Sequence, residues 1–298
     1  MHRSGTSLIS SILQEAGLFI GDKLIGASDG NNKGHFENRD FYNFQATALE
    51  SLHLDPDGWD LQSIKTLNKE FDKKATEIIQ KNERNEWGWK DPRTTLFLNY
   101  WENKISDIKY LFVYRDPWDV IDSLYRRASD AKILADPTLA FKSWDFYNRE
   151  IITIYKKHKE DSIIVHIDDV IADVASTISN INTRFGFHLK HETVGTIFDK
   201  SMYKCSDENL FYSRQTALAF PEIINTLNEL RTLSGKEIFK LEKDTQNKMA
   251  EKAIGHFVTG WSDLYFQKQK VKILEEEIAL MKQSRFWKLR QLLCKLKG

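Results

Sequence analysis

Residues 108–117 read IKYLFVYRDP and carry the clearest structural signal in the sequence. The first seven of them form a nearly continuous apolar run of strand length, which is typical of a strand buried on both faces. Arg115 and Asp116 end the run, and Pro117 is well placed to begin a helix because its fixed φ suits the first helical position. A buried strand that leads directly into a helix is typical of a parallel sheet covered by helices.

The same alternation of strand and helix continues along the chain. A second buried strand is predicted at residues 162–167 (SIIVHI) and a short one at 87–90 (WGWK). Amphipathic periodicity predicts long helices over residues 68–82, 138–158 and 170–185. The sequence therefore predicts an α/β fold, a three-layer sandwich with a central parallel sheet and helices on both faces.

Ligands of such sheets bind at the carboxyl ends of the strands. Four polar clusters follow the ends of predicted strands or, for the first cluster, of an inferred strand: residues 2–7, 90–93, 115–117 and 168–169. We expect the functional side chains to lie among them.

The chain opens with a polar loop, MHRSGTS at residues 1–7, that runs directly into a helical pattern. Gly5 and Ser7 fit the second glycine and the hydroxyl position of the phosphate-binding loop G-x-x-x-x-G-K-[ST], whereas Thr6 stands where the lysine belongs. Amides at a helix N-terminus attract an anion, and Arg3 supplies a cation ahead of them. The loop is therefore poorly suited to ATP or GTP hydrolysis and well suited to a smaller anion. Helix capping without a ligand is the alternative.

Loops of this composition normally follow a buried strand, so we expect a first strand ahead of Met1 in the ancestral or complete chain. An internal methionine taken for the start codon is the explanation we favour. Without that strand the loop would lack support and sheet edges would be exposed, which would weaken nucleotide binding.

Arg115 is the basis of a second predicted anion site. It ends the buried strand, and Ser123 follows on the flank of the next helix. An arginine and a hydroxyl over the same sheet edge can clamp a phosphate. The alternatives are an ion pair of Arg115 with a nearby aspartate and a bond from Ser123 to a helix carbonyl.

These motifs together resemble a known family. HRSGTS at residues 2–7 resembles the 5′-phosphosulfate loop of the sulfotransferases that use 3′-phosphoadenosine-5′-phosphosulfate (PAPS), and YRDP at 114–117 with Ser123 resembles their 3′-phosphate motif. KDPR at 90–93 is similar to a Lys-Asp-Pro element of tyrosylprotein and bacterial members, and GHFEN at 34–38 resembles a segment of bacterial members.

The resemblance covers residues 1–265 and implies a PAPS-binding domain with a P-loop-type fold, acting on an acceptor hydroxyl without a metal. It implies that the 5′-phosphosulfate is held by Arg3, Ser4, Gly5, Thr6 and Ser7, and the 3′-phosphate by Arg115 and Ser123. Lys90 would contact the bridging oxygen, and Arg3 would also act in catalysis by stabilising charge on the leaving oxygen.

The acceptor's proton needs a base. The resemblance implies Glu37, which follows the loop helix at a family-like distance, and a partly buried glutamate can act near neutral pH. Histidine serves in cytosolic members of the family, so His35 and His2 are the competitors.

Residues 266–298 differ from the rest and are predicted to form a helical tail. Val271, Leu274, Ile278 and Met281 follow a 3–4 spacing, and the charges after Met281 are all basic and interleaved with apolar residues. Such a basic amphipathic helix is compatible with an anionic membrane surface or with pairing to another helix, including self-association. The segment SRFWKLR at 284–290 resembles the tail of bacterial proteins that build surface polysaccharides, which points to a glycan acceptor.

Composition excludes several classes of protein. The 298 residues contain 43 Lys+Arg and 43 Asp+Glu, so no overall positive field draws the chain to nucleic acid. Two cysteines exclude a disulfide scaffold and a four-cysteine zinc site. Without an apolar run of about 18 residues, we expect a cytoplasmic protein that could contact the inner face of the membrane through its tail.

Two other functions remain open from the sequence. One is a P-loop kinase of a small molecule, which the missing loop lysine disfavours. The other is a degenerate, non-catalytic relative that binds 3′-phosphoadenosine-5′-phosphate (PAP) as a scaffold.

Overall fold

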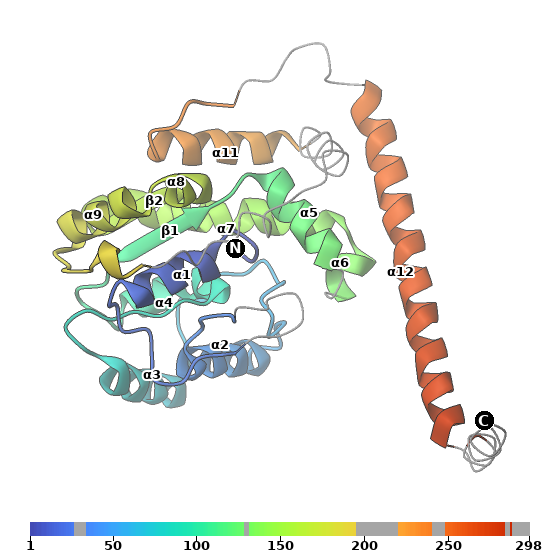
Figure 1. Cartoon of the computed structure of the whole chain (residues 1–298), viewed down its shortest axis with the longest axis horizontal. Coiled ribbons are helices and arrows are strands. Elements are labelled where there is room, and N and C mark those ends of the chain that lie inside the picture. Colours follow the sequence, from blue (N-terminus) through green and yellow to red (C-terminus); the bar gives the residue numbers. More distant parts are fainter. Residues whose placement is uncertain (27–33, 128–130, 195–219, 240–247, 284–286, 288–298) are drawn as a thin grey trace, which may run out of the picture.

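A parallel pair of strands, β1 (Tyr110–Tyr114) and β2 (Ser162–His166), lies at the centre of the fold. Their register pairs Tyr110 with Ser162 and Tyr114 with His166, which confirms the parallel arrangement expected for these two apolar segments. The structure is a computed structural model, and it describes residues 1–26, 34–127, 131–194, 220–239, 248–283 and 287 (Figure 1). Over these residues the chain is mixed α/β and mostly helical, with a two-stranded sheet.

Helices make up most of the remaining described chain. The α-helices are α1 (Thr6–Glu15), α2 (Arg39–Ser51), α3 (Lys69–Asn82), α4 (Leu98–Glu102), α5 (Pro117–Arg127), α6 (Ala131–Ala135), α7 (Thr138–Lys157), α8 (Ile167–Ala172), α9 (Val174–Phe185), α11 (Pro221–Leu233) and α12 (Lys248–Gln283). The short 3₁₀ helices are η1 (Pro92–Phe97), η2 (Lys159–Asp161) and η3 (His191–Thr193).

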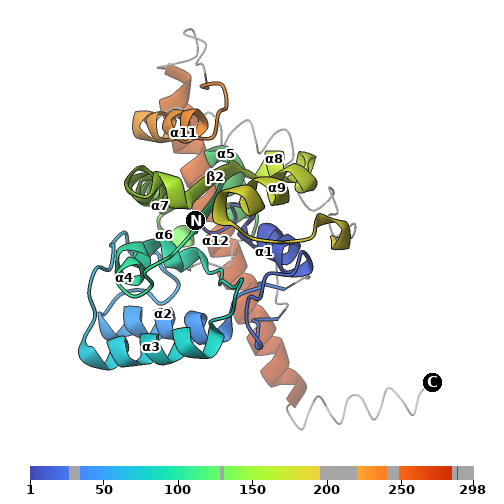
Figure 2. The ribbon, with the colours of Figure 1, turned by 90° about the vertical axis from the view of Figure 1, so that its left-hand side faces the viewer.

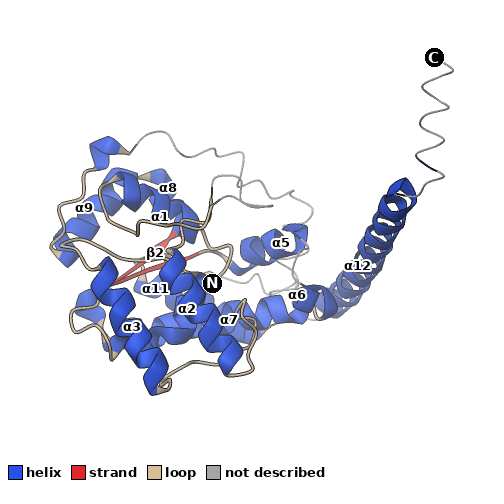
Figure 3. Ribbon diagram, turned by 90° about the horizontal axis from the view of Figure 1, so that it is seen from below, coloured by secondary structure: helices blue, strands red, loops and turns tan. Residues whose placement is uncertain are grey.

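Helices cover both faces of the strand pair because side chains alternate along a strand. Tyr110, Phe112 and Tyr114 of β1 point into a large core shared with α2, α5, α7 and α11. Val113 points the other way, into a second core built from α1, α8 and α9. Figures 2 and 3 show the strands with helices on either side.

Two sequence-based predictions differ from the structure. Residues 87–90 form no strand; Trp87 makes one isolated bridge to Phe19. The reason is aromatic packing, because the Trp89 ring stacks on Phe41 of α2 at a centroid distance of 4.1 Å. The helix predicted over 170–185 is broken at Asp173, whose extended backbone ends α8 and whose carboxylate caps α9. By contrast, α3 and α7 match the helices predicted at 68–82 and 138–158.

The C-terminal helix α12 is longer than the predicted tail. It begins at Lys248, so Phe266 lies within one continuous helix. In Figure 1 it runs along one side of the molecule beside α6. Most of the basic segment after Met281 (284–286 and 288–298) lies outside the described residues. Among the helices that are described, none combines the length and the apolar composition needed to cross a bilayer.

The carboxyl end of β1 is fixed by one buried hydrogen bond. The indole Nε1 of Trp144, on α7, donates to the carbonyl oxygen of Arg115 at 3.1 Å. Trp144 is fully buried, so the bond is shielded from water. It ties α7 to the point where the chain leaves β1 and enters α5.

We expect Trp144→Phe to lower the free energy of unfolding, because it removes the indole donor that bonds the buried Arg115 carbonyl. The loss of unfolding free energy should exceed that of a control Trp→Phe variant by about 1–3 kcal/mol, as measured by urea denaturation. Trp101→Phe is the matched control: Trp101 is equally buried, and its indole nitrogen has no hydrogen-bond partner. Equal losses in the two variants would show that the Trp144 bond contributes nothing.

Candidate active site

The loop at residues 1–7 presents the N-terminus of α1. Gly5 is the N-cap of that helix and has a φ of 86°, a left-handed conformation that glycine adopts readily. No side chain caps the helix, so the capping role considered for the loop hydroxyls is not the one observed. The first amides of a helix have no intrahelical partner, and they are therefore available to an anion here.

Ser4 is the most unusual residue of this loop. It is fully buried, and its Oγ has no hydrogen-bond partner. A buried hydroxyl without a partner is costly, and Ser4 directly precedes Gly5, the N-cap of α1. The loop therefore meets one requirement of an anion site: a polar group that a ligand could satisfy.

Lys90 lies over the start of α1 and joins three segments of the chain. Its Nζ donates to Ser7 Oγ at 3.1 Å, to the His35 carbonyl oxygen at 3.1 Å and to Glu37 Oε1 at 2.7 Å. The Lys90 and Glu37 side chains are only 13% and 8% exposed. Sequence reasoning assigned Lys90 and Glu37 to the site separately, and the structure makes them a buried ion pair.

The environment of Glu37 alters its proton affinity. Burial raises the pKa of the Glu37 carboxyl above its ordinary value of 4.5; the Lys90 ammonium opposes this rise, and the nearby Asp91 carboxylate adds to it. A carboxylate with a raised pKa is a stronger base than an exposed one.

The backbone around Glu37 is held on both sides. The Ile25 amide donates to the Glu37 carbonyl at 2.8 Å, and Leu24 forms an antiparallel bridge with Asn38. The buried Asn38 amide donates to the Ile20 carbonyl at 3.1 Å and to Asn82 Oδ1 at 2.8 Å. Asn38 Oδ1 also caps α2. Asn38 is therefore a positioning residue for Glu37 that the sequence did not reveal.

A second buried ion pair, between Asp91 and Arg93, directly follows Lys90 in the chain. The Asp91 carboxylate accepts from the Arg93 amide at 2.8 Å and pairs with its guanidinium at 2.6 Å. Arg93 reaches on to the carbonyl oxygens of Pro56 (2.7 Å) and Tyr42 (3.1 Å). The KDPR segment thus has one residue directed at the candidate site and two that fix its backbone.

The two predicted anion sites meet in the structure. Arg3 Nε donates to Ser123 Oγ at 2.9 Å, although 120 residues separate them. Ser123 lies on α5 and is buried, as is Arg115 at the end of β1. The Arg115 Nε lies 3.7 Å from the Asp119 carboxylate, so a long form of the alternative ion pair is also present. Asp168 and Asp169 of the fourth polar cluster instead contact His166 and Lys236.

Backbone strain accompanies these contacts. Arg3 and Phe36 both have positive φ values, 63° and 54°, which residues with a Cβ rarely adopt. Each precedes a residue of the site, Ser4 and Glu37 respectively. Strain of this kind is found preferentially where the surrounding structure holds functional groups in place.

The histidines considered as bases lie differently from Glu37. The His2 ring packs on Trp59 at a centroid distance of 4.9 Å, and its Nε2 lies 3.0 Å from the Asp57 carbonyl oxygen. Burial lowers the pKa of His2 well below its usual value. His35 contributes its carbonyl oxygen to Lys90 and its amide to Ile25.

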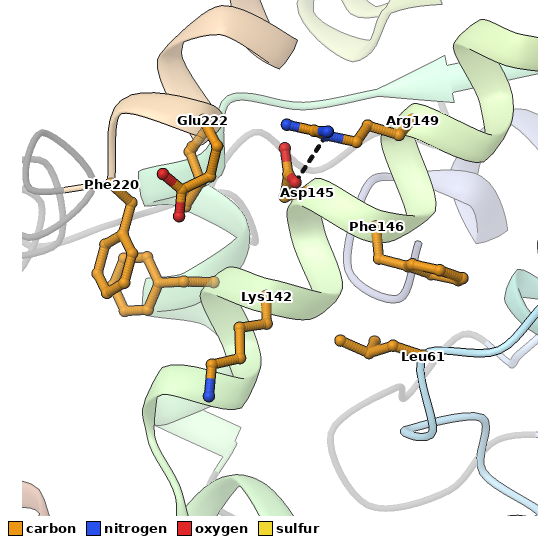
Figure 4. Close-up of a pocket in the computed structure, with 9 residues that line it drawn as sticks. Leu61, Lys142, Asp145, Phe146, Arg149, Phe220 and Glu222 are labelled. Atoms are coloured by element: carbon orange, nitrogen blue, oxygen red, sulfur yellow. Dashed lines mark ion pairs between the residues drawn. The ribbon is translucent and has the colours of Figure 1, made fainter.

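A separate hollow of about 300 Å³ opens between α7 and the start of α11 (Figure 4). The stacked rings of Phe141 and Phe220 and the Asp145–Arg149 ion pair line it, and Leu61 closes one side. None of the predicted site residues is part of its lining. The hollow is therefore distinct from the candidate active site.

Over the residues that the structure describes, no group of three or more His, Cys, Asp and Glu side chains is arranged to hold a metal ion. Comparison of the chain with protein-family models, with curated proteins and with solved structures finds no match in any of the three.

We expect Lys90→Met to destabilise the protein in a pH-dependent way. Without the ammonium the buried Glu37 carboxylate is uncompensated, so its pKa in the folded state rises further. The folded protein then keeps a proton that the unfolded chain releases near pH 4.5, and the free energy of unfolding falls as the pH rises above that value.

The expected deficit at pH 7 is about 3–5 kcal/mol, shrinking toward pH 5, as measured by urea denaturation at several pH values. The control is Lys90→Met with Glu37→Gln, which removes the titrating group and with it the pH-dependent part of the loss. A deficit that is the same at every pH would contradict a buried Glu37–Lys90 ion pair.

Proposed function

We propose that this protein is a PAPS-dependent sulfotransferase of the bacterial type, built on a P-loop-type three-layer sandwich. It would transfer the sulfuryl group of PAPS to an acceptor hydroxyl on a glycan. PAPS supplies the activated sulfuryl group, and the residues of the chain bind the donor, orient it and move one proton.

The contact between Arg3 and Ser123 carries this proposal. PAPS has phosphate groups on the 5′ and 3′ sides of one ribose, so its two anion sites must be neighbours. The residues assigned to these sites from separate motifs are joined by a 2.9 Å hydrogen bond. A hydroxyl that accepts from Arg3 still has its own hydrogen to donate to a phosphate oxygen.

The start of α1 suits the 5′-phosphosulfate. Its free amides and partial positive charge favour an anion, and the buried Ser4 Oγ, without a partner, could bind a phosphate oxygen. The phosphate-loop lysine is absent, and Arg3 and Lys90 are the cations near the helix start. This arrangement favours a donor that transfers a sulfuryl group over one that is hydrolysed with magnesium.

Lys90 and Glu37 fit the chemical step. An ammonium has three hydrogens, and those of Lys90 are directed to Ser7, His35 and Glu37. Lys90 would exchange its bond to Ser7 for one to the bridging oxygen, where negative charge develops as the sulfur–oxygen bond breaks. Glu37 would accept the hydroxyl proton of the acceptor as the new sulfur–oxygen bond forms.

The resemblance of residues 284–290 to the tail of proteins that build surface polysaccharides supports a glycan acceptor. Two loops would line the acceptor pocket. One is residues 55–66, which Arg93 bonds through the Pro56 carbonyl, and the other is residues 24–36, which lie partly outside the described residues.

Arg115→Ala should weaken PAP binding about 10- to 100-fold, because a charge-assisted contact to the 3′-phosphate is worth about 1.5–3 kcal/mol. AMP lacks that phosphate, so its affinity should change by less than about threefold. Isothermal titration calorimetry on both ligands measures the difference. Arg84→Ala, at an exposed arginine, is the control. Ser123→Ala tests the same 3′-phosphate site and should weaken PAP binding less than Arg115→Ala does. Equal losses for PAP and AMP would refute the 3′-phosphate assignment.

Glu37→Gln should lower kcat about 10²- to 10⁴-fold while leaving the Kd for PAP nearly unchanged, because the amide keeps the shape and loses the basic oxygen. The assay follows labelled sulfate from PAPS into polysaccharide extracts. His35→Gln and His2→Gln are the matched comparisons, and a larger loss in either would make that histidine the base. Tight PAP binding with no transfer to any acceptor would instead favour the non-catalytic scaffold.

A further inference from the structure

The described part of α12 exposes an unusual amount of apolar surface. Every side chain from 266 to 283 is exposed to solvent. Seven of them are large and apolar: Phe266, Val271, Ile273, Leu274, Ile278, Leu280 and Met281. A contiguous apolar surface of this kind on a long helix marks a site of interaction.

Four of these side chains form a single stripe. Val271, Leu274, Ile278 and Met281 are spaced by three, four and three residues, which is the a–d repeat of a coiled coil. The two a positions carry the β-branched residues Val271 and Ile278, and the d positions carry Leu274 and Met281. β-Branched residues at a with unbranched-β residues such as leucine at d favour two parallel strands.

The charges beside the stripe select the same arrangement. Positions g and e are Lys270, Glu275, Glu277 and Lys282. In a parallel pair each g residue faces the e residue five positions later in the second copy, so Lys270 meets Glu275 and Glu277 meets Lys282. An antiparallel pair centred on the same stripe would place Glu275 opposite Glu275 and Glu277 opposite Glu277, which is repulsive.

We propose that α12 pairs with α12 of a second copy of this chain as a short parallel coiled coil, with its seam at Val271, Leu274, Ile278 and Met281. The seam is about 15 Å long, so the pairing is weak and depends on protein concentration. The proposal does not depend on the donor or on the proposed reaction.

A lipid surface fits this stretch of the helix less well. An interfacial helix that binds anionic lipid carries its cations across the polar face, whereas three glutamates, residues 275–277, lie at the middle of this stripe. Two of these glutamates, Glu275 and Glu277, are matched by lysines of a second copy, and Glu276 lies at position f, away from the seam. The observations therefore favour the second copy as the partner.

Ile273 and Leu274 provide a sharp comparison. They are neighbours with similar exposure, 55% and 46%, but Ile273 occupies position c, outside the seam. Leu274→Glu should abolish dimerisation of the full-length protein, and Ile273→Glu should leave it intact. Sedimentation equilibrium from about 1 to about 200 µM protein measures the mass, with the unmodified chain passing from monomer to dimer.

Charge-reversal variants at positions e and g test the parallel orientation. Glu275→Lys places two lysines opposite each other at both edges of a parallel seam and should raise the dimer Kd about tenfold. Adding Lys270→Glu restores the opposite charges and should restore the dimer. In an antiparallel pair the double variant would give no such rescue.

Several outcomes would overturn the proposal. These are a monomer at every concentration, equal disruption by Ile273→Glu and Leu274→Glu, or a trimer or larger assembly. A fourth is a monomeric chain that binds vesicles of anionic phosphatidylglycerol through α12, which would show that the stripe contacts lipid.

Discussion

The Lys90 ammonium is the interaction on which the arrangement of the candidate site depends. It is held by Ser7, the His35 carbonyl and Glu37, which belong to two separate segments of the chain. Asp91 and Arg93 follow directly and fix the backbone from which the lysine extends. The start of α1, the Glu37 carboxyl and the KDPR segment therefore keep their relative positions through one charged group.

Stability alone does not account for such a centre. The free energy needed to remove two charges from water often exceeds the attraction within a buried ion pair. Apolar side chains of similar volume often stabilise a fold as well or better. The same region also contains two non-glycine residues with positive φ, Arg3 and Phe36, and a buried Ser4 hydroxyl without a partner. Each of these features lowers stability, and all are understandable where charge has to be stabilised in a dry site.

The sequence predicted those features that depend on local pattern. The apolar runs predicted β1 and β2, and amphipathic periodicity predicted α3 and α7, because burial of one face is recorded directly in residue spacing. It failed at Trp87–Trp89, where aromatic side chains pack on Phe41 rather than extending a sheet, and at Asp173, where a capping side chain ends one helix and starts another. The Glu37–Lys90 pair and the role of Asn38 could not be predicted, because contacts across 53 and 44 residues leave no local trace.

The contact of Arg3 with Ser123 changes how the two anion sites have to be understood. The motifs treat them as separate pockets, one for each end of a nucleotide. In the structure a single guanidinium lies at their boundary and bonds the hydroxyl of the second site. Guanidinium carries five N–H donors in a rigid fork, and the Nε–H of Arg3 is the donor that bonds Ser123. The hydrogen bond from Arg3 to Ser123 therefore ties the loop at residues 1–7 directly to α5.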